Sequence, residues 1–214
     1  MKHYPKIQTL YKRDDTKRII LGDWTTPELD YLQNNTWEFT EKVDGTSIVI
    51  NWDQTIREIG GHTAKSQIPT ELYAKLDALF PVAKLAGVFP PKDAPYEVAL
   101  YGEGYGGKIQ KGGKYRPDVS LVLFDVRIGR WWMKYPDMCN IAEQLGIDVV
   151  PHLGYGTLRY AVRLVETGFN SKWGEFPAEG IVARTPPGLL ARNGERLICK
   201  IKTKDFKHEQ TDIS

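Results

Sequence analysis

The chain of 214 residues has few cysteines and no long apolar runs. Its two cysteines, Cys139 and Cys199, each lie inside a short apolar run, which predicts small buried thiols in a reducing compartment rather than a disulfide. The longest apolar runs are too short to cross a bilayer, which excludes a membrane protein. No apolar stretch follows the basic N-terminus, so it lacks the pattern of a secretory signal, and we expect a cytoplasmic protein.

Net charge is also low. The 29 Lys and Arg residues against 27 Asp and Glu give +2, which does not by itself indicate a nucleic-acid-binding protein. Any phosphate-binding surface must therefore be local. The four histidines lack metal-ligand spacing with either cysteine, which gives a structural zinc site no support. The chain also lacks internal repeats and low-complexity linkers, so we expect a single domain over residues 1–214.

Short segments rich in β-branched and aromatic residues predict strands along most of the chain. The predicted strands are 36–43, 47–52, 55–60, 96–104, 119–128, 180–185 and 196–203. Helical spacing and capping signals predict helices over 70–86, from Asp137 to Gly146, and over 157–167. Asn193-Gly194 is a hairpin signal, from which we expect the last two strands to pair. The fold class is therefore α+β, with mainly antiparallel sheets flanked by a few helices.

One short motif combines a lysine with a tight turn. In Glu41-Lys42-Val43-Asp44-Gly45-Thr46-Ser47 the lysine ends one predicted strand, and the glycine permits the turn into the next. A lysine held in this way can face a pocket. By itself, however, a K-x-D-G motif is most often a solvated turn with an ordinary surface lysine.

A pair of lysines follows near the C-terminus. In Lys200-Ile201-Lys202, strand alternation places both ammonium groups on one face of a sheet and Ile201 on the other. Two neighbouring cations are costly unless an anion lies between them, and a triphosphate or a nucleic-acid backbone is the usual anion. A solvated edge strand is the alternative interpretation.

Two glutamates occupy positions suited to a ligand. Glu103 lies among glycines that let a backbone approach a ligand closely, although a glycine-rich turn would give the same pattern. Glu179 directly precedes the predicted strand 180–185, where its oxygens can bind a hard cation such as Mg²⁺. Neither residue is informative alone.

In chain order, the segments EKVDGTS, YGEGYG, LFDV, EGIV and KIK resemble the five collinear motifs of covalent nucleotidyltransferases, a superfamily of ligases and capping enzymes. The resemblance spans residues 37–206 and is closest to the RNA-ligase branch, because KIKTKDF is similar to that branch's final motif with its trailing aromatic residue. It implies the nucleotidyltransferase fold, an ATP-grasp-like ligase adenylation fold. It also implies ATP and Mg²⁺ as cofactors, with Mn²⁺ as an alternative metal.

The resemblance assigns a role to each matching residue. Lys42 matches the lysine that attacks the α-phosphate of ATP and carries AMP. Glu103 would hydrogen-bond the ribose, Phe124 would stack on adenine, and Glu179 would assist metal binding. The remaining ATP-binding positions are Lys200 and Lys202 at the phosphates, with Ser47 and the backbone around Glu41 and Val43 at the nucleoside.

Phe124 and His62 are the two ATP-binding positions for which the residues alone do not support the role that the resemblance implies. Strand alternation places Phe124 on the face opposite Asp125, and from the residues alone it would be a core phenylalanine. His62, in Gly60-Gly61-His62-Thr63, stands where the family usually has an arginine. A histidine cannot grip a phosphate with two parallel donors, so we expect weaker phosphate binding or end joining.

Only 12 residues follow Lys202, so we expect a bare nucleotidyltransferase domain without the C-terminal OB or helical domain that relatives carry. Polynucleotide binding would then depend on surface residues. The basic, glycine-rich loop 106–118 provides candidates, although a solvated loop is the alternative. These candidates are Lys108, Lys111, Lys114 and Arg116.

The expected activity is ATP-dependent joining of RNA ends, a 5′-phosphate and a 3′-hydroxyl, through a lysyl-AMP intermediate. The alternatives are a nucleotidyltransferase-like module that binds RNA ends with little or no catalysis, a DNA ligase, and a GTP-dependent capping enzyme. A nicked duplex is a further substrate that fits the resemblance, and an end-healing enzyme is a further partner. The oligomeric state stays open.

Overall fold

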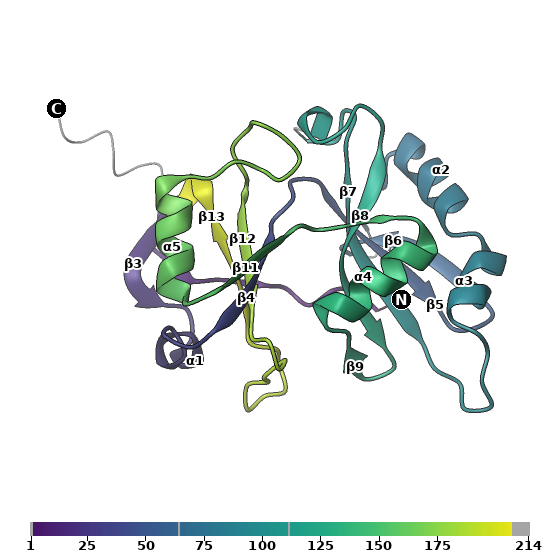
Figure 1. Ribbon diagram of the computed structural model, residues 1–214, viewed down its shortest axis with the longest axis horizontal. Helices are drawn as coiled ribbons and strands as arrows, with labels where there is room; N and C mark the ends of the chain where they lie inside the picture. The colour runs from purple at the N-terminus through teal and green to yellow at the C-terminus, as the bar shows by residue number, and fades with distance from the viewer. Residues whose placement is uncertain (1, 64, 111, 207–214) are drawn as a thin grey trace. The chain divides into compact units, whose positions relative to one another are not determined.

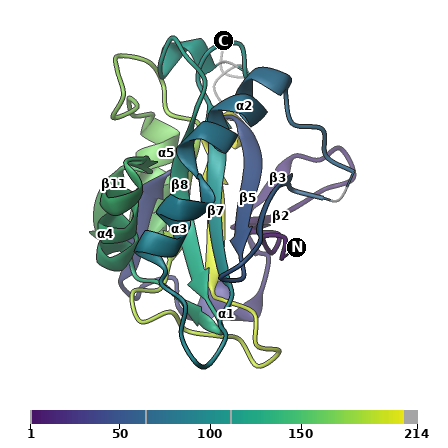
Figure 2. The same cartoon turned by 90° about the vertical axis from the view of Figure 1, so that its right-hand side faces the viewer.

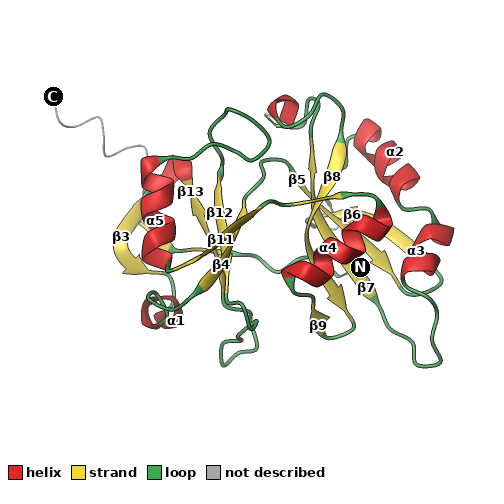
Figure 3. Ribbon diagram, viewed as in Figure 1, coloured by secondary structure: helices red, strands yellow, loops and turns green. Residues whose placement is uncertain are grey.

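The structure is a computed structural model that describes residues 2–63, 65–110 and 112–206. It divides into two compact units, one of Met1–Pro5 with Asp44–Val150 and one of Lys6–Val43 with Pro151–Ser214. Each unit is built on a mainly antiparallel sheet with helices beside it, as the strands and helices in Figure 3 show. The predicted α+β class is therefore confirmed. That both units belong to one nucleotidyltransferase domain stays a prediction.

The first unit contains a sheet in the order β10-β8-β7-β5-β6, with β9 paired to β8. Neighbouring strands are antiparallel except β10 and β8. The bounds are β5 (Thr46–Trp52), β6 (Arg57–Gly61), β7 (Val98–Tyr105), β8 (Ser120–Ile128), β9 (Trp131–Trp132) and β10 (Asp148–Val149).

The helices of the first unit cover one face of this sheet (Figure 2). They bury a row of leucines that includes Leu72, Leu76 and Leu85, because the strand residues on that face are apolar. The bounds are α2 (Thr70–Leu79), α3 (Val82–Val88), α4 (Tyr135–Leu145) and the short 3₁₀ helix η1 (Gly112–Lys114).

Two predicted helices differ from the structure. The helix predicted over 70–86 is two helices, because Pro81 has no N–H to continue the ladder and Phe80 before it leaves the helical region at φ −121° and ψ 54°. The second predicted helix begins at Tyr135, with Lys134 rather than Asp137 as N-cap, and Pro136 favours this earlier start. It ends at Gly146 as predicted, at φ 59°.

The second unit contains a sheet in the order β1-β13-β12-β4-β11 and a separate β2–β3 hairpin. Helix α5 (Leu158–Thr167) packs along this sheet (Figure 1), over a core that includes Trp37, Phe39 and Ile181. The strands are β1 (Gln8–Thr9), β2 (Tyr11–Arg13), β3 (Ile19–Trp24), β4 (Trp37–Glu41), β11 (His152–Gly156), β12 (Gly180–Arg184) and β13 (Ile198–Lys202). The helices are α1 (Pro27–Tyr31), α5 (Leu158–Thr167) and the 3₁₀ helix η2 (Thr203–Asp205).

Several predictions for this unit are confirmed. Strands β12 and β13 pair antiparallel, with Ile181 opposite Ile201, and α5 fills the predicted helix over 157–167 apart from its N-cap, Thr157. Cys199 is fully buried, and burial raises the pKa of its thiol to about 12. Cys139, in the other unit, is only partly buried, and both cysteines are free. Within the described ranges, every helix is too short or too polar to span a membrane.

Candidate active site

Lys42 follows the last residue of β4, beside the start of β12. Its backbone N–H donates to the carbonyl of Gly180 at 2.9 Å, which continues the β4–β12 pairing by one residue. Its side-chain Nζ donates to Oε2 of Glu179 at 2.7 Å and contacts the carbonyl of Val43 at 3.4 Å. The pairing of two strands that are distant in sequence therefore brings the predicted nucleophile to the predicted metal-binding carboxylate.

Glu179 also contacts the second lysine of the C-terminal pair. Its Oε1 lies 3.1 Å from Nζ of Lys202, so one carboxylate bridges Lys42 and Lys202. Its backbone carbonyl accepts from the N–H of Thr203 at 2.9 Å, which fixes the main chain on the β13 side. The three side chains are between 17% and 21% exposed, so the cluster is screened from bulk water but can still be reached by a ligand.

Gly180 is required for this arrangement. Its φ of +154° lies in a region that residues with a side chain rarely adopt, and an added Cβ would lie 2.1 Å from the carbonyl oxygen of Ile201. Glycine at this position therefore lets β12 begin against β13 with Glu179 directly before it.

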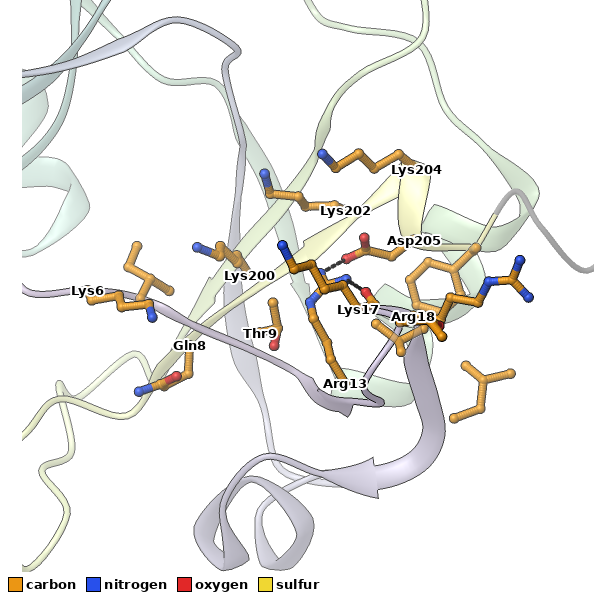
Figure 4. A pocket seen from close by; sticks show the side chains of 15 residues that line it. Lys6, Gln8, Thr9, Arg13, Lys17, Arg18, Lys200, Lys202, Lys204 and Asp205 are labelled. Carbon is orange, nitrogen blue, oxygen red and sulfur yellow. Dashed lines mark hydrogen bonds and ion pairs between the residues drawn. The ribbon is translucent and has the colours of Figure 1, made fainter.

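The predicted alternation of the lysine pair is confirmed. Ile201 is 2% exposed in the core, and the half-buried side chains of Lys200 and Lys202 line the opposite face (Figure 4). Burial lowers the pKa of Lys200, and the positive charges of Lys202, Lys42 and Lys6 lower it further, while Glu179 opposes the shift. The site therefore concentrates positive charge, which an anionic ligand would stabilise.

The side chain of Glu41 holds a neighbouring turn in place, a role that the sequence did not predict. Its buried carboxylate accepts from Oγ of Ser171 at 2.6 Å and from the backbone N–H of Lys172 at 2.9 Å. Burial raises the pKa of Glu41, and these two hydrogen bonds oppose the increase. The side chain thus anchors the 171–173 turn to the end of β4. The expectation that the backbone around Glu41 lines the nucleoside pocket stays a prediction.

The first unit gathers the predicted nucleoside-binding residues on one sheet face. Ser47 on β5 and Glu103 on β7 are direct cross-strand partners, and Glu103 is in turn opposite Val122 on β8. Phe124 lies two residues along from Val122 and packs against Val49 and other residues of this face. Alternating positions on three strands therefore place Ser47, Glu103 and Phe124 on the same surface.

The prediction that Phe124 and Asp125 lie on opposite faces is wrong. A register shift in the β7–β8 pairing places Asp125 opposite Tyr101 and Leu123 opposite Gly102, which leaves Phe124 as the extra residue of a β-bulge. Asp125 therefore lies on the face that carries Phe124. Tyr4 contacts both, because its ring lies 5.0 Å from the Phe124 ring and its hydroxyl donates to Oδ2 of Asp125 at 2.7 Å.

The turn after Lys42 depends on close backbone packing. A Cβ at Gly45 would lie 2.3 Å from the carbonyl oxygen of Gly104 and 2.8 Å from Cγ of Glu103, so the turn passes directly over β7. The N–H of Asp44 donates to the hydroxyl of Tyr115 at 3.2 Å. The K-x-D-G glycine is thus needed to pack the turn, and Tyr115 is a supporting residue without a sequence signal.

The other predicted contact residues lie in more open places. His62 is exposed and directly follows β6, and Lys108 and Lys114 are exposed in the basic loop. The guanidinium of Arg116 forms ion pairs with Asp118 at 2.9 Å and with Asp148 at 3.2 Å, and it lies over the ring of Tyr105. Lys111 lies outside the described residues.

Metal binding depends on the donor groups present. Within the described part of the chain, no three His, Cys, Asp or Glu residues gather in a way that would hold a metal ion by themselves. Magnesium, however, is commonly bound through one or two carboxylates together with substrate phosphates and water. Glu179, with one oxygen at Lys42 and the other at Lys202, a predicted phosphate contact, fits that mode of binding.

Both the sequence and the fold are similar to those of known proteins. The sequence profile of the RNA ligase family matches residues 35–202, while no curated protein matches the chain. The fold is similar to solved structures of Naegleria gruberi RNA ligase. A mutant with ATP and Mn has a TM-score of 0.66 at 16% identity over 97% of this chain and 62% of that one. A mutant with AMP and Mn has a TM-score of 0.64 at 15% identity over 98% of this chain and 65% of that one.

A third structure, of the same ligase with pyrophosphate, gives a TM-score of 0.64 at 16% identity over 98% of this chain and 65% of that one. The chain thus spans less than two thirds of the length of the ligases it resembles. The similarity confirms the predicted nucleotidyltransferase-type fold. Because the family profile covers most of the sequence, including all five motifs, the chain belongs to the RNA ligase family.

Proposed function

We propose that the protein is an ATP-dependent RNA ligase that forms a lysyl-AMP intermediate on Lys42. The observation that carries this proposal is the bridge from Lys42 through the Glu179 carboxylate to Lys202, with the half-buried Lys200 on the same strand face as Lys202. A nucleophile, a metal-binding carboxylate and two phosphate-binding cations are thereby held on three adjoining strand ends. The similar Naegleria ligases, solved with ATP and Mn or with AMP and Mn, support ATP and a divalent metal as cofactors.

In the first step the neutral amine of Lys42 attacks the α-phosphorus of ATP. A P–N bond forms, the bond from the α-phosphorus to the bridging oxygen breaks, and pyrophosphate leaves with that electron pair while the amine gives up a proton. Glu179 would hold a divalent cation in place of its ion pair with Lys42, which would leave the amine free to lose its proton. When bound, that cation polarises the phosphates and assists the departure of pyrophosphate.

Lys200 and Lys202 would stabilise the charge that develops on the α-phosphate as it becomes five-coordinate. Their position on a strand, rather than on a loop, fixes them before the substrate arrives. On the other unit, Ser47, Glu103 and Phe124 would bind the nucleoside, with the ring of Phe124 against the base. The family resemblance also assigns His62, directly after β6, to the phosphates.

The later steps join the RNA ends. AMP would pass from Lys42 to the 5′-phosphate of one strand, and the 3′-hydroxyl of the other would then attack that phosphate and displace AMP. Lys108, Lys111, Lys114 and Arg116 would contact the strands, with Arg116 exchanging part of its carboxylate pairing for phosphate. A nicked duplex as substrate, an end-healing partner, and a cytoplasmic role in RNA repair are part of the same proposal.

The test begins with α-labelled ATP, or GTP, and a divalent metal. We expect wild-type protein to retain label from ATP after denaturation, and Lys42→Arg to retain none, because arginine preserves the charge beside Glu179 but remains protonated and cannot act as the nucleophile. Labelled protein is then incubated with 5′-phosphorylated RNA or with the matching DNA. Transfer of label to RNA supports ligation, whereas label that comes from GTP indicates capping chemistry.

Failure to label freshly nucleotide-free wild-type protein with either nucleotide would refute the catalytic proposal and favour a module that binds RNA ends. Label that passes to DNA but not to RNA would instead favour a DNA ligase. Preferential transfer to a nicked duplex would define the substrate more narrowly within the proposal.

A further inference from the structure

A basic groove of about 1060 Å³ lies along β13 in the second unit, and we call it the N-terminal groove (Figure 4). One wall is β13 with the η2 turn after it, and the other is the segment from residue 6 through the β2–β3 hairpin. Strand β1 runs parallel to β13, with Thr9 opposite Lys200, so the N-terminal segment is paired to the strand that carries the phosphate-binding lysines. The groove therefore extends outward from the candidate active site.

Charge in this groove is almost entirely positive. Of the described side chains that line it, seven are cationic and one is a carboxylate, Asp205. The cations are Lys200 and Lys202 together with Lys6, Arg13, Lys17, Arg18 and Lys204. Asp205 has an 8% exposed side chain and pairs with the guanidinium of Arg13 at 2.6 Å, so it offers little negative charge to solvent. This local surface contrasts with a net charge of only +2 for the whole chain.

Several of these cations lie outside any close ion pair among the described residues. Within the described residues, no carboxylate forms an ion pair with Lys6, Lys17, Arg18 or Lys204. Like charges that are held close together repel one another, and an external polyanion relieves that repulsion. The groove is thus suited to binding phosphates.

The hairpin that carries Lys17 and Arg18 is held in place. Oδ1 of Asp14 accepts from the N–H groups of Thr16 and Arg18, both at 2.9 Å, which stabilises the turn. Arg13 joins this turn to the other wall, because its guanidinium donates to the carbonyl of Lys17 at 2.7 Å and also binds Asp205. Lys17 and Arg18 are therefore presented by a defined turn, which lowers the entropic cost of binding.

The size of the groove favours a chain of phosphates over a single small anion. Its volume is at the upper end of that for sites that enclose a drug-sized ligand, which is roughly 300–1,000 Å³, and a pyrophosphate would occupy only a small part of it. Its lining also includes apolar side chains such as Ile19 and Leu21, which suit the sugars and bases between phosphates. Lys202, where an RNA end would react under the proposed function, lines the groove.

We propose that the N-terminal groove binds the phosphate backbone of the RNA strand whose end is held at Lys202. This inference rests on the proposed function for the identity of the polyanion, and it adds a strand-binding surface that the five motifs do not include. Lys17 and Arg18 lie on the hairpin side of Lys200 and Lys202, and Lys6 lies on the other side (Figure 4). These contacts bind the phosphate backbone and give no preference for a particular base sequence.

The test compares Lys17→Gln/Arg18→Gln with Arg163→Gln/Arg192→Gln. The control pair removes the same charge from exposed residues outside the groove. Binding of a 5′-phosphorylated single-stranded RNA is measured over a range of salt, without ATP, and lysyl-AMP formation is measured separately. Melting temperatures establish that each variant is folded.

Each lost phosphate contact should reduce the slope of log K against log salt by about 0.7, so the hairpin variant should have a slope shallower by about 1.4. If affinities agree near 1 M salt, this corresponds to roughly 25-fold weaker binding at 0.1 M salt. The control variant should bind like wild type, and both variants should form lysyl-AMP at the wild-type rate.

Unchanged RNA binding by the folded hairpin variant overturns the groove proposal and leaves the ligase proposal standing. Unchanged RNA binding with slower lysyl-AMP formation, or with weaker binding of inorganic pyrophosphate, also overturns it, because the groove would then hold the polyphosphate of ATP. Equal weakening in the control variant would indicate diffuse attraction by net charge and would count against a defined site. If wild-type protein forms no lysyl-AMP, the ligase proposal fails, and the RNA-binding comparison still decides whether the groove binds a strand.

Discussion

Lys42 and Glu179 form an ion pair of 2.7 Å although 137 residues separate them in the chain. The β4–β12 pairing produces this contact, since Ile181 lies opposite Glu41, Lys42 then bonds to Gly180, and Glu179 directly precedes Gly180. Because Glu179 also reaches Lys202, removal of the carboxylate would affect both the proposed nucleophile and a proposed phosphate-binding lysine. The first prediction concerns that carboxylate.

Glu179→Gln should reduce the rate of lysyl-AMP formation by about tenfold or more, because the amide keeps the size of the side chain but binds a divalent cation poorly. The measurement is the initial rate of label incorporation over a range of Mg²⁺ and Mn²⁺ concentrations. A rate that recovers at high metal concentration would indicate weakened metal binding. Glu175→Gln, at an exposed position in the loop before β12, is the matched control. Equal rates for both variants and wild type would show that Glu179 has no role in the step.

Gly180→Ala should destabilise the fold, because the new Cβ would meet the carbonyl oxygen of Ile201 at 2.1 Å and the backbone is at φ +154°. We expect a loss of about 1–3 kcal/mol in the free energy of unfolding. For a chain of this size each kcal/mol lowers Tm by about 2–4 °C. Gly188→Ala tests conformational strain alone, since Gly188 has φ +71° and an added Cβ would have nothing within 4 Å. Calorimetry that found equal Tm values for the two variants would contradict the steric argument.

Lys200 should make stability increase with pH in the alkaline range. Its pKa is lowered in the folded state, chiefly by burial, so between that lowered value and the ordinary lysine value of 10.5 the unfolded chain binds more protons than the folded one. The free energy of unfolding therefore rises with pH in that window, and the destabilisation due to the buried charge is fully present below it. Lys200→Met should remove this rise and be more stable than wild type at neutral pH.

The comparison is the difference in unfolding free energy between wild type and Lys200→Met, measured by denaturant titration at several pH values, which cancels the titration of other groups. Lys92→Met, at an exposed position in the other unit, is the control and should leave the pH dependence unchanged. A wild-type protein that loses stability relative to Lys200→Met as pH rises would contradict the predicted sign.

His62→Arg should strengthen phosphate binding, since arginine offers two parallel donors and a permanent charge at the end of β6. A charged hydrogen bond of about 1.5–3 kcal/mol corresponds to roughly a 10- to 100-fold gain in affinity, expected as a lower KM for ATP or for the 5′-phosphorylated strand. His62→Lys should gain less, because lysine is a point charge without the planar fork. No change in either KM would place His62 away from the phosphates.

Much of the site was predictable from local sequence. Lys42, Glu179, Lys200 and Lys202 are each marked by short motifs, and strand alternation gave the shared face of the two C-terminal lysines correctly. Other features depend on long-range packing. The bulge at Phe124 arises from its pairing with β7, and the hydrogen bonds of Glu41 come from the 171–173 turn, which has no sequence signal.

The differences between the predicted and observed helices have local causes in the sequence. Pro81 divides the segment after Thr70, and Pro136 favours a start before Asp137. The N-terminal groove could not be predicted in this way, because its cations come from both ends of the chain and meet through the parallel β1–β13 pairing and the Arg13–Asp205 ion pair.

The most direct test of the central claim is to identify the residue that carries AMP. Purified protein is incubated with ATP and a divalent metal, digested, and its peptides are analysed by mass spectrometry for an acid-labile AMP adduct, while pyrophosphate release is measured in parallel. The adduct should be on Lys42, with one pyrophosphate released for each AMP retained, and both should be absent from Lys42→Arg. An adduct on another lysine, or pyrophosphate release with Lys42 unmodified, would contradict the assignment of Lys42 as the nucleophile.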